Sequence, residues 1–80
     1  MFLHAGNGRN IREKDIIGIF DMDNATISSV TRKYLTAEQK AGRVESASID
    51  IPKSFIIYKT SDGTRVMFSS LSAAALIGRM

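Results

Sequence analysis

Runs of apolar residues before residue 52 predict three strands. Residues 2–5 form a short strand candidate, and residues 6–8, Gly-Asn-Gly, offer the backbone freedom that a tight turn requires. The nearly continuous apolar run at 15–21 is typical of a strand that is covered on both faces. A further strand is predicted at 44–51. The residues on one side of that strand are Ala47, Ile49 and Ile51.

Two apolar segments, at 54–60 and 64–69, flank Asp62-Gly63 and predict a β-hairpin with a two-residue loop. This loop would pair Tyr58 with Met67 and Ile57 with Phe68. One face of the hairpin then carries Phe55, Ile57, Val66 and Phe68, and the other carries Ile56, Tyr58 and Met67. Because both faces are apolar, one must cover the core while the other requires a helix or a neighbouring subunit.

A helix is predicted at 28–41, after a stretch of small polar residues. Four residues recur at spacings of four, three and four, and we expect this stripe to face the core: Val30, Tyr34, Ala37 and Ala41. Gly42 stands where glycine favours the end of a helix. The opposite face carries Arg32, Thr36, Gln39, Lys40 and Arg43.

The C-terminal stretch, SSLSAAALIGRM, predicts a short helix that is capped by Ser69 or Ser70. The element order is therefore strand, strand, helix, strand, strand, strand, helix. This order predicts an α+β fold of about five strands and two helices, with residues 1–80 in a single domain. We expect self-association through the sheet and the C-terminal helix, whose small residues allow close approach to another surface.

Composition supports self-association and limits the possible chemistry. Chains of this size bury only roughly 60% of the surface of the unfolded form, and many rely on disulfides, metals or oligomers for stability. The sequence has no cysteine and only one histidine, which excludes disulfides and thiolate or His-rich zinc sites. Self-association is the remaining source of stability.

The net charge of +3 permits a nucleic-acid partner without requiring one. No apolar run approaches the roughly 20 residues that a membrane span needs. The N-terminus also lacks the basic start and long apolar stretch of a signal peptide. We therefore expect a cytoplasmic protein without a membrane partner.

Two aspartates follow the strand predicted at 15–21. Asp21 and Asp23 have the spacing of the first motif of haloacid-dehalogenase-like phosphatases, where one carboxylate is the nucleophile and the other an acid/base. Ala25 stands where that family has Thr or Val, and 80 residues are too few for the rest of its fold. A strand end followed by helix-capping residues is the alternative that we favour. We predict neither an enzyme nor a cofactor.

The basic face of the predicted helix is the main candidate for a binding site. Arg32, Lys40 and Arg43 share one side of the helix, and Lys33 flanks them. These residue types suit contacts with phosphate oxygens, although the same pattern is typical of a solvated helix face. Thr26 and the serines near it would bring backbone N–H groups of the helix start to a phosphate.

Four segments cover nearly the whole chain in this order: MFLHAGNG, KDIIGIFD, IDIPKSFII and FSSLSAAAL. Together they resemble the extracellular matrix regulator family RemA/RemB of spore-forming Gram-positive bacteria, and the RemB branch most closely. The resemblance implies a cytoplasmic regulator that assembles into symmetric rings, binds double-stranded DNA at promoters and controls biofilm matrix genes. Subunits that each contribute a few cations would then form a strong, salt-sensitive DNA surface.

The resemblance also implies where DNA would bind. RemA-type proteins carry an arginine-rich stretch before the strand that corresponds to 55–58, whereas here residues 50–52, Asp-Ile-Pro, precede a single basic residue, Lys53. At the helix start, Thr26 and two serines replace a proline and basic residues. The expected nucleic-acid-binding residues are Lys53, Arg32, Thr26, Arg43 and Lys40.

Two other functions stay open beside DNA-binding regulation. The small number of basic residues before Lys53 favours an oligomeric interaction protein or accessory regulator that does not itself bind DNA. The pair of aspartates leaves a metal-dependent phosphatase as the least favoured possibility.

Overall fold

The computed structural model describes residues 1–6, 8–25, 29–47 and 51–80. Within them, the strands are β1 (Phe2–Gly6), β2 (Arg9–Arg12), β3 (Ile16–Asp21), β4 (Val44–Ser46), β5 (Ser54–Thr60) and β6 (Gly63–Ser69). The helices are α1 (Met22–Ala25), α2 (Ser29–Lys40) and α3 (Ala73–Gly78), and a 3-10 turn (Glu13–Asp15) precedes β3. No described helix has the length and apolar character that crossing a membrane requires.

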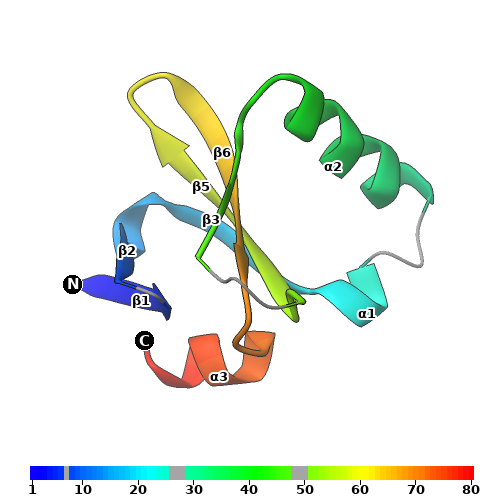
Figure 1. The fold of residues 1–80 in the computed structure, drawn as a ribbon. Coiled ribbons are helices and arrows are strands. Elements are labelled where there is room, and N and C mark those ends of the chain that lie inside the picture. Colours follow the sequence, from blue (N-terminus) through cyan, green and yellow to red (C-terminus); the bar gives the residue numbers. More distant parts are fainter. Residues whose placement is uncertain (7, 26–28, 48–50) are drawn as a thin grey trace.

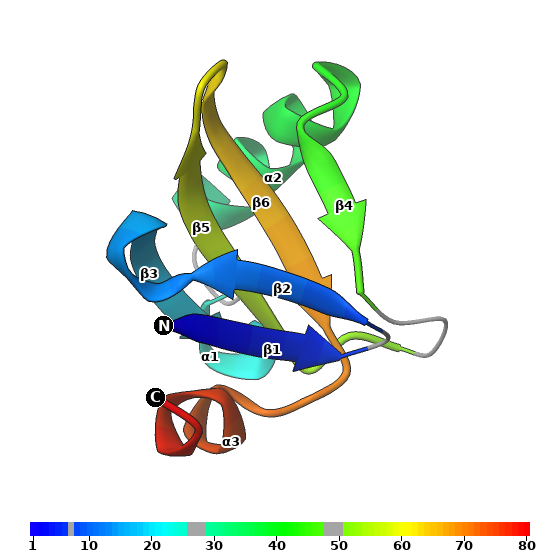
Figure 2. The same cartoon turned by 90° about the vertical axis from the view of Figure 1, so that its left-hand side faces the viewer.

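Four strands form a sheet in the order β3-β5-β6-β4, while β1 and β2 form a separate hairpin. Neighbouring strands of the sheet are antiparallel, except that β4 runs parallel to β6. Figure 1 and Figure 2 show the β1–β2 hairpin and α2 on opposite sides of the sheet. The predicted α+β fold is therefore confirmed.

Both apolar faces of the β5–β6 hairpin are covered within the chain. On one face, Ile56 packs in a buried cluster with residues of the β1–β2 hairpin and with Leu76 of α3. On the other face, Phe55 and Val66 pack against Leu35 of α2. Elements of the same chain therefore cover both faces of the hairpin, so neither face requires a neighbouring subunit to cover it. Self-association stays a prediction.

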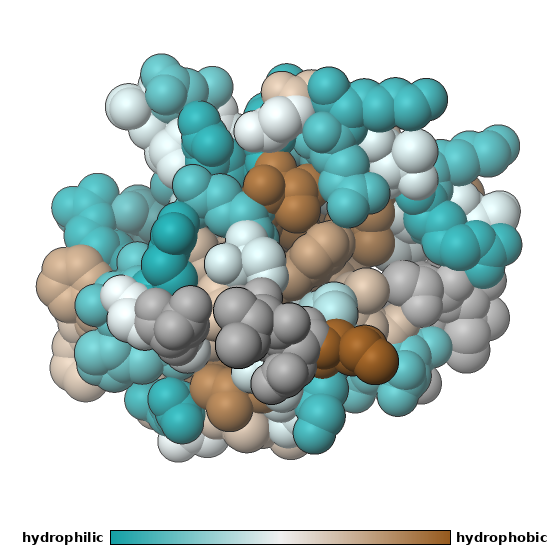
Figure 3. Space-filling view, viewed as in Figure 1, coloured by the Kyte–Doolittle hydropathy of each residue, from teal (hydrophilic) through white to brown (hydrophobic). Residues whose placement is uncertain are grey.

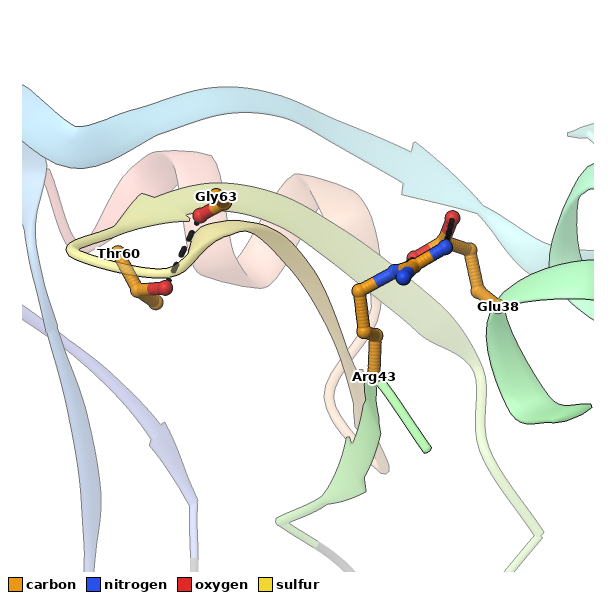
Figure 4. A network of polar contacts seen from close by, with 4 residues as sticks. All are labelled: Glu38, Arg43, Thr60 and Gly63. Atoms are coloured by element: carbon orange, nitrogen blue, oxygen red, sulfur yellow. Dashed lines mark hydrogen bonds and ion pairs between the residues drawn. The ribbon is translucent and has the colours of Figure 1, made fainter. Parts of the chain in front are cut away.

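The turn of the β5–β6 hairpin differs from the predicted one. The observed partners, Tyr58 with Arg65 and Ile57 with Val66, replace the predicted Met67 and Phe68. Thr60 lies opposite Gly63, and its hydroxyl donates a hydrogen bond of 3.0 Å to the Gly63 carbonyl (Figure 4). The φ of 116° at Gly63 suits glycine alone. Since side chains alternate with a period of two, a shift of two residues leaves the predicted faces unchanged.

The bounds of α2 agree closely with the helix predicted at 28–41. Of the predicted core stripe, Tyr34 is partly buried and packs against the cluster that contains Leu35, but Val30, Ala37 and Ala41 are exposed, so the stripe is wrong at these three positions. Val30 is 75% exposed, whereas Leu35 is 7% exposed and faces the sheet.

Leu35 is a large aliphatic side chain in the middle of α2. Its burial stabilises the orientation in which the Leu35 side of the helix faces the sheet. The neighbouring Glu38 is also buried, at 7% exposed, and is paired with Arg43.

The outer strands also differ from their predictions. β3 is an edge strand rather than a strand covered on both faces, and Ile17 on it is 56% exposed. β4 ends at Ser46, well before residue 51, and residues 48–50 lie outside the described chain. Ile51 is 86% exposed, so the predicted apolar side of that strand does not extend to it.

Two short elements, β2 and α3, also differ from the prediction. β2 was not predicted because Arg9–Arg12 contains a single apolar residue, Ile11, which is buried. α3 begins after Ser72, whose side chain accepts a hydrogen bond of 3.1 Å from the Ala75 N–H. The predicted caps, Ser69 and Ser70, precede the helix, and Ser69 belongs to β6.

Candidate nucleic-acid interface

The outer side of α2 carries a shallow furrow of about 410 Å³. Its lining residues recur every three or four positions and therefore lie on one stripe of the helix: Ser29, Arg32, Lys33, Thr36, Ala37 and Lys40. Hydrophilic residues cover this side of the molecule, to the right in Figure 3. The basic face that the sequence predicted is therefore at the surface and includes Lys33 and Ala37.

The residues that line the furrow include three basic and no acidic side chains. Within the described ranges, neither Lys33 nor Lys40 forms an ion pair. The Thr36 hydroxyl donates a hydrogen bond of 2.9 Å to the Arg32 carbonyl, so it is engaged within the helix. An anion in the furrow would therefore meet cationic side chains above a floor of small residues, including Ala37.

Lys53 has an exposed side chain on a fixed backbone. Its N–H donates a hydrogen bond of 2.8 Å to the Ser69 carbonyl, and its own carbonyl accepts one of 2.9 Å from the Met22 N–H. The lysine therefore joins the end of β6 to the start of α1 through its main chain. Only the side chain is free to meet a ligand, and Pro52 restricts the backbone before it.

Arg43 is engaged differently from the other expected cations. Its guanidinium donates hydrogen bonds of 2.8 and 3.1 Å to the two carboxylate oxygens of Glu38 (Figure 4). The hydrogen bond from Arg43 lowers the pKa of Glu38 below its ordinary value; burial opposes this shift and the Arg43 charge adds to it. Because Glu38 offsets its charge, Arg43 is the weaker candidate for a phosphate contact.

Two features from the sequence cannot be placed in this interface. Thr26 lies outside the described residues. Asp21 accepts a hydrogen bond of 2.9 Å from the Asp23 N–H, which makes it a cap at the start of α1. In the part of the chain that the structure describes, no three His, Asp or Glu side chains come together in a metal site.

The sequence reasoning missed an exposed aromatic side chain on the sheet. Phe20 of β3 is 40% exposed and stacks on Phe55 of β5, with ring centroids 5.2 Å apart. A Cβ atom at Gly18 would lie 2.7 Å from two atoms of the Phe20 ring. The signal available in the sequence was this glycine, two positions before an aromatic residue inside an apolar strand.

Comparison with protein-family models gave no match, and neither did comparison with curated proteins. The function must therefore be argued from the arrangement of the side chains and from the sequence pattern.

Proposed function

We propose that this protein is a DNA-binding transcriptional regulator of extracellular matrix genes that acts as a symmetric homo-oligomer. The observation that supports the proposal is the furrow of α2, which gathers Arg32, Lys33 and Lys40 along one exposed stripe. The resemblance to the RemA/RemB family supplies the expected biological role.

The dimensions of α2 suit the backbone of a duplex. Arg32 and Lys40 are eight residues apart, which corresponds to about 12 Å along a helix that rises 1.5 Å per residue. B-DNA carries a phosphate on each strand about every 3.4 Å of its helix axis, so cations about 12 Å apart can meet more than one phosphate. Contacts of this kind position a protein on DNA without reading its sequence.

Lys53 would add a cation from a rigid part of the fold. Since its backbone is hydrogen-bonded on both sides, ordering the lysine on DNA costs only the entropy of the side chain. One lysine is a small contribution in one subunit. Repetition in an oligomer multiplies it, because each neutralised phosphate adds about 0.9 to the slope of log K against log salt.

A salt series with a fluorescent duplex tests the proposal. We expect the affinity to fall steeply with salt, and Lys53→Ala to lower the affinity and reduce the slope by about one for each contact removed. Lys14→Ala is the matched control, because Lys14 is also exposed but belongs to the 3-10 turn. No binding at low salt, or equal effects of the two substitutions, would contradict the proposal. Light scattering on the same samples measures the oligomer.

A second candidate, an accessory regulator that acts through protein contacts, is supported by Ile51. This residue is 86% exposed and lies two positions before Lys53, at the stretch where RemA-type chains are basic. An exposed aliphatic side chain at this place suits a protein partner better than a phosphate. Mixing with a RemA-type relative should then give a joint species in light scattering, and separate elution would exclude it.

A further inference from the structure

Three phenylalanine rings form a row across the sheet, on the side that α2 partly covers. Phe20 of β3 stacks on Phe55 of β5, with centroids 5.2 Å apart and ring planes inclined by 21°. Phe55 meets Phe68 of β6 edge to face, with centroids 6.5 Å apart. Phe55 is 1% exposed, whereas Phe20 is 40% exposed. The row therefore leads from the core to the surface and ends at Phe20.

Phe20 is 40% exposed, and one of its ring faces points away from Phe55. The other ring face lies against Phe55, and β3 is an edge strand, so no further strand of the described chain continues the row. Gly18 leaves room for the ring: a Cβ there would lie 2.7 Å from two ring atoms. The Phe20 ring is thus stacked on Phe55, which is buried in the core, and lies close to Gly18, which has no side chain to displace it.

A cation stands beside this ring. Phe20 lies opposite Phe55, and Lys53 is two residues before Phe55, which is about 7 Å along a strand. Lys53 lies just before β5 begins, its side chain is exposed, and its carbonyl accepts the N–H of Met22, two residues after Phe20. Asp23, the residue that follows Met22 in the sequence, has an exposed side chain.

We propose that Phe20 is a stacking platform for one unpaired base of a nucleic acid and that Lys53 binds the adjacent phosphate. A nucleotide offers both a planar π-face and an anionic group, and the site presents an open aromatic face next to a cation. Stacking of a base on an aromatic side chain tolerates every base, so the site would bind single strands without sequence preference. The proposal rests on the proposed function, because it refines which form of nucleic acid this surface binds.

The test uses the whole chain, a short fluorescent oligothymidylate and a mixed-sequence duplex. Phe20→Leu should weaken binding of the oligothymidylate about tenfold and leave its salt slope unchanged, because it removes stacking and no charge. Lys53→Ala should reduce the slope. Phe2→Leu is the matched control, since Phe2 is an exposed phenylalanine on β1, away from this row. Asp23→Asn should strengthen binding.

A second variant keeps the test independent of any loss of stability. The chain has no tryptophan, so Phe20→Trp places a single tryptophan at this position, which can be excited selectively beside the two tyrosines. Binding of oligothymidylate should quench the tryptophan fluorescence, as stacking of a base on the indole requires. The platform would be overturned if Phe20→Leu and Phe2→Leu bound oligothymidylate with the same affinity. It would also be overturned if Phe20→Trp bound oligothymidylate without a loss of tryptophan fluorescence.

The duplex separates the two proposals. Duplex binding with no effect at Phe20 would overturn the platform and leave the regulator. Binding of oligothymidylate that depends on Phe20, without duplex binding, would overturn the regulator and support the platform. Absence of binding to both nucleic acids would overturn both.

Discussion

Ser69 connects the β1–β2 hairpin to the sheet, and its removal tests how that layer is held. The side chain is fully buried, with 0% exposed. Its hydroxyl donates a hydrogen bond of 2.6 Å to the Ala5 carbonyl of β1 and accepts one of 3.1 Å from the Leu71 N–H. Ser69→Ala removes one oxygen atom, adds no volume and leaves two backbone groups without this partner.

The expected cost follows from the burial of these groups. The hydrogen bond between the Ser69 hydroxyl and the Ala5 carbonyl is buried. A buried carbonyl left without a hydrogen-bond partner lowers the free energy of unfolding by about 1 to 3 kcal/mol. The Leu71 contact is only partly buried, so its loss corresponds to a net hydrogen bond of about 0.5 to 1.5 kcal/mol. We therefore expect about 2 to 4 kcal/mol in the free energy of unfolding. A domain of 80 residues has roughly 4 to 12 kcal/mol in total.

Urea unfolding of the wild type, Ser69→Ala and Ser70→Ala measures this effect at one protein concentration. Ser70 is the control, since it is adjacent, partly exposed and has no hydrogen bond of its side chain within the described chain. Ser70→Ala should change the free energy of unfolding by less than about 0.5 kcal/mol. If Ser69→Ala is as mild as its control, the hydroxyl does not hold the hairpin and the reasoning is refuted.

Two further predictions concern pH. The pKa of Glu38 is lowered from 4.5 by Arg43, so their pairing stabilises the fold above that pH and is lost as the pH falls below it. Wild type and Arg43→Gln should therefore differ in the urea midpoint at neutral pH and converge in acid, and a constant difference would contradict this. The pKa of Tyr58 is raised above 10.0 by burial and by Glu45, so its contribution holds below pH 10 and is lost as the pH rises. The difference between the ultraviolet titrations of wild type and Tyr58→Phe isolates this tyrosine, and its midpoint should lie above pH 10; a midpoint at or below that pH would contradict the prediction.

Local patterns were sufficient for much of the fold. The alternation of apolar residues predicted the two faces of the β5–β6 hairpin correctly. The predicted turn was wrong, but the register differs by two residues, and a shift of two leaves the same side chains on each face. The bounds of α2 and the exposure of its basic face also followed from spacing and from Gly42. Arg32, Lys33 and Lys40 could be grouped because Lys33 and Lys40 are seven residues apart, about two turns of a helix, and Arg32 adjoins Lys33.

The rotation of α2 could not be read from spacing, because the predicted stripe is the more apolar one, whereas packing on the sheet buries the side that carries Leu35 together with the charged Glu38. Contact with Phe55 and Val66 favours the side of Leu35, and Glu38 on the same helix pairs with Arg43, five residues later in the chain. That pairing removes one cation from the candidate interface, which the basic residues in the sequence do not reveal.

Neighbours on separate strands define the remaining features of the site. The proposed role of Phe20 depends on the position of β3 at the sheet edge beside β5. Lys53 is held near it because its N–H donates to the Ser69 carbonyl of β6 and its carbonyl accepts the Met22 N–H of α1. Hydrophobic periodicity records which residues of one element share a face, since that depends on backbone geometry within the element. It does not record which strand lies next to which, because pairing depends on contacts between distant parts of the chain. Residue types and spacing thus set the elements and their polar and apolar faces, and packing between elements set which side chains meet.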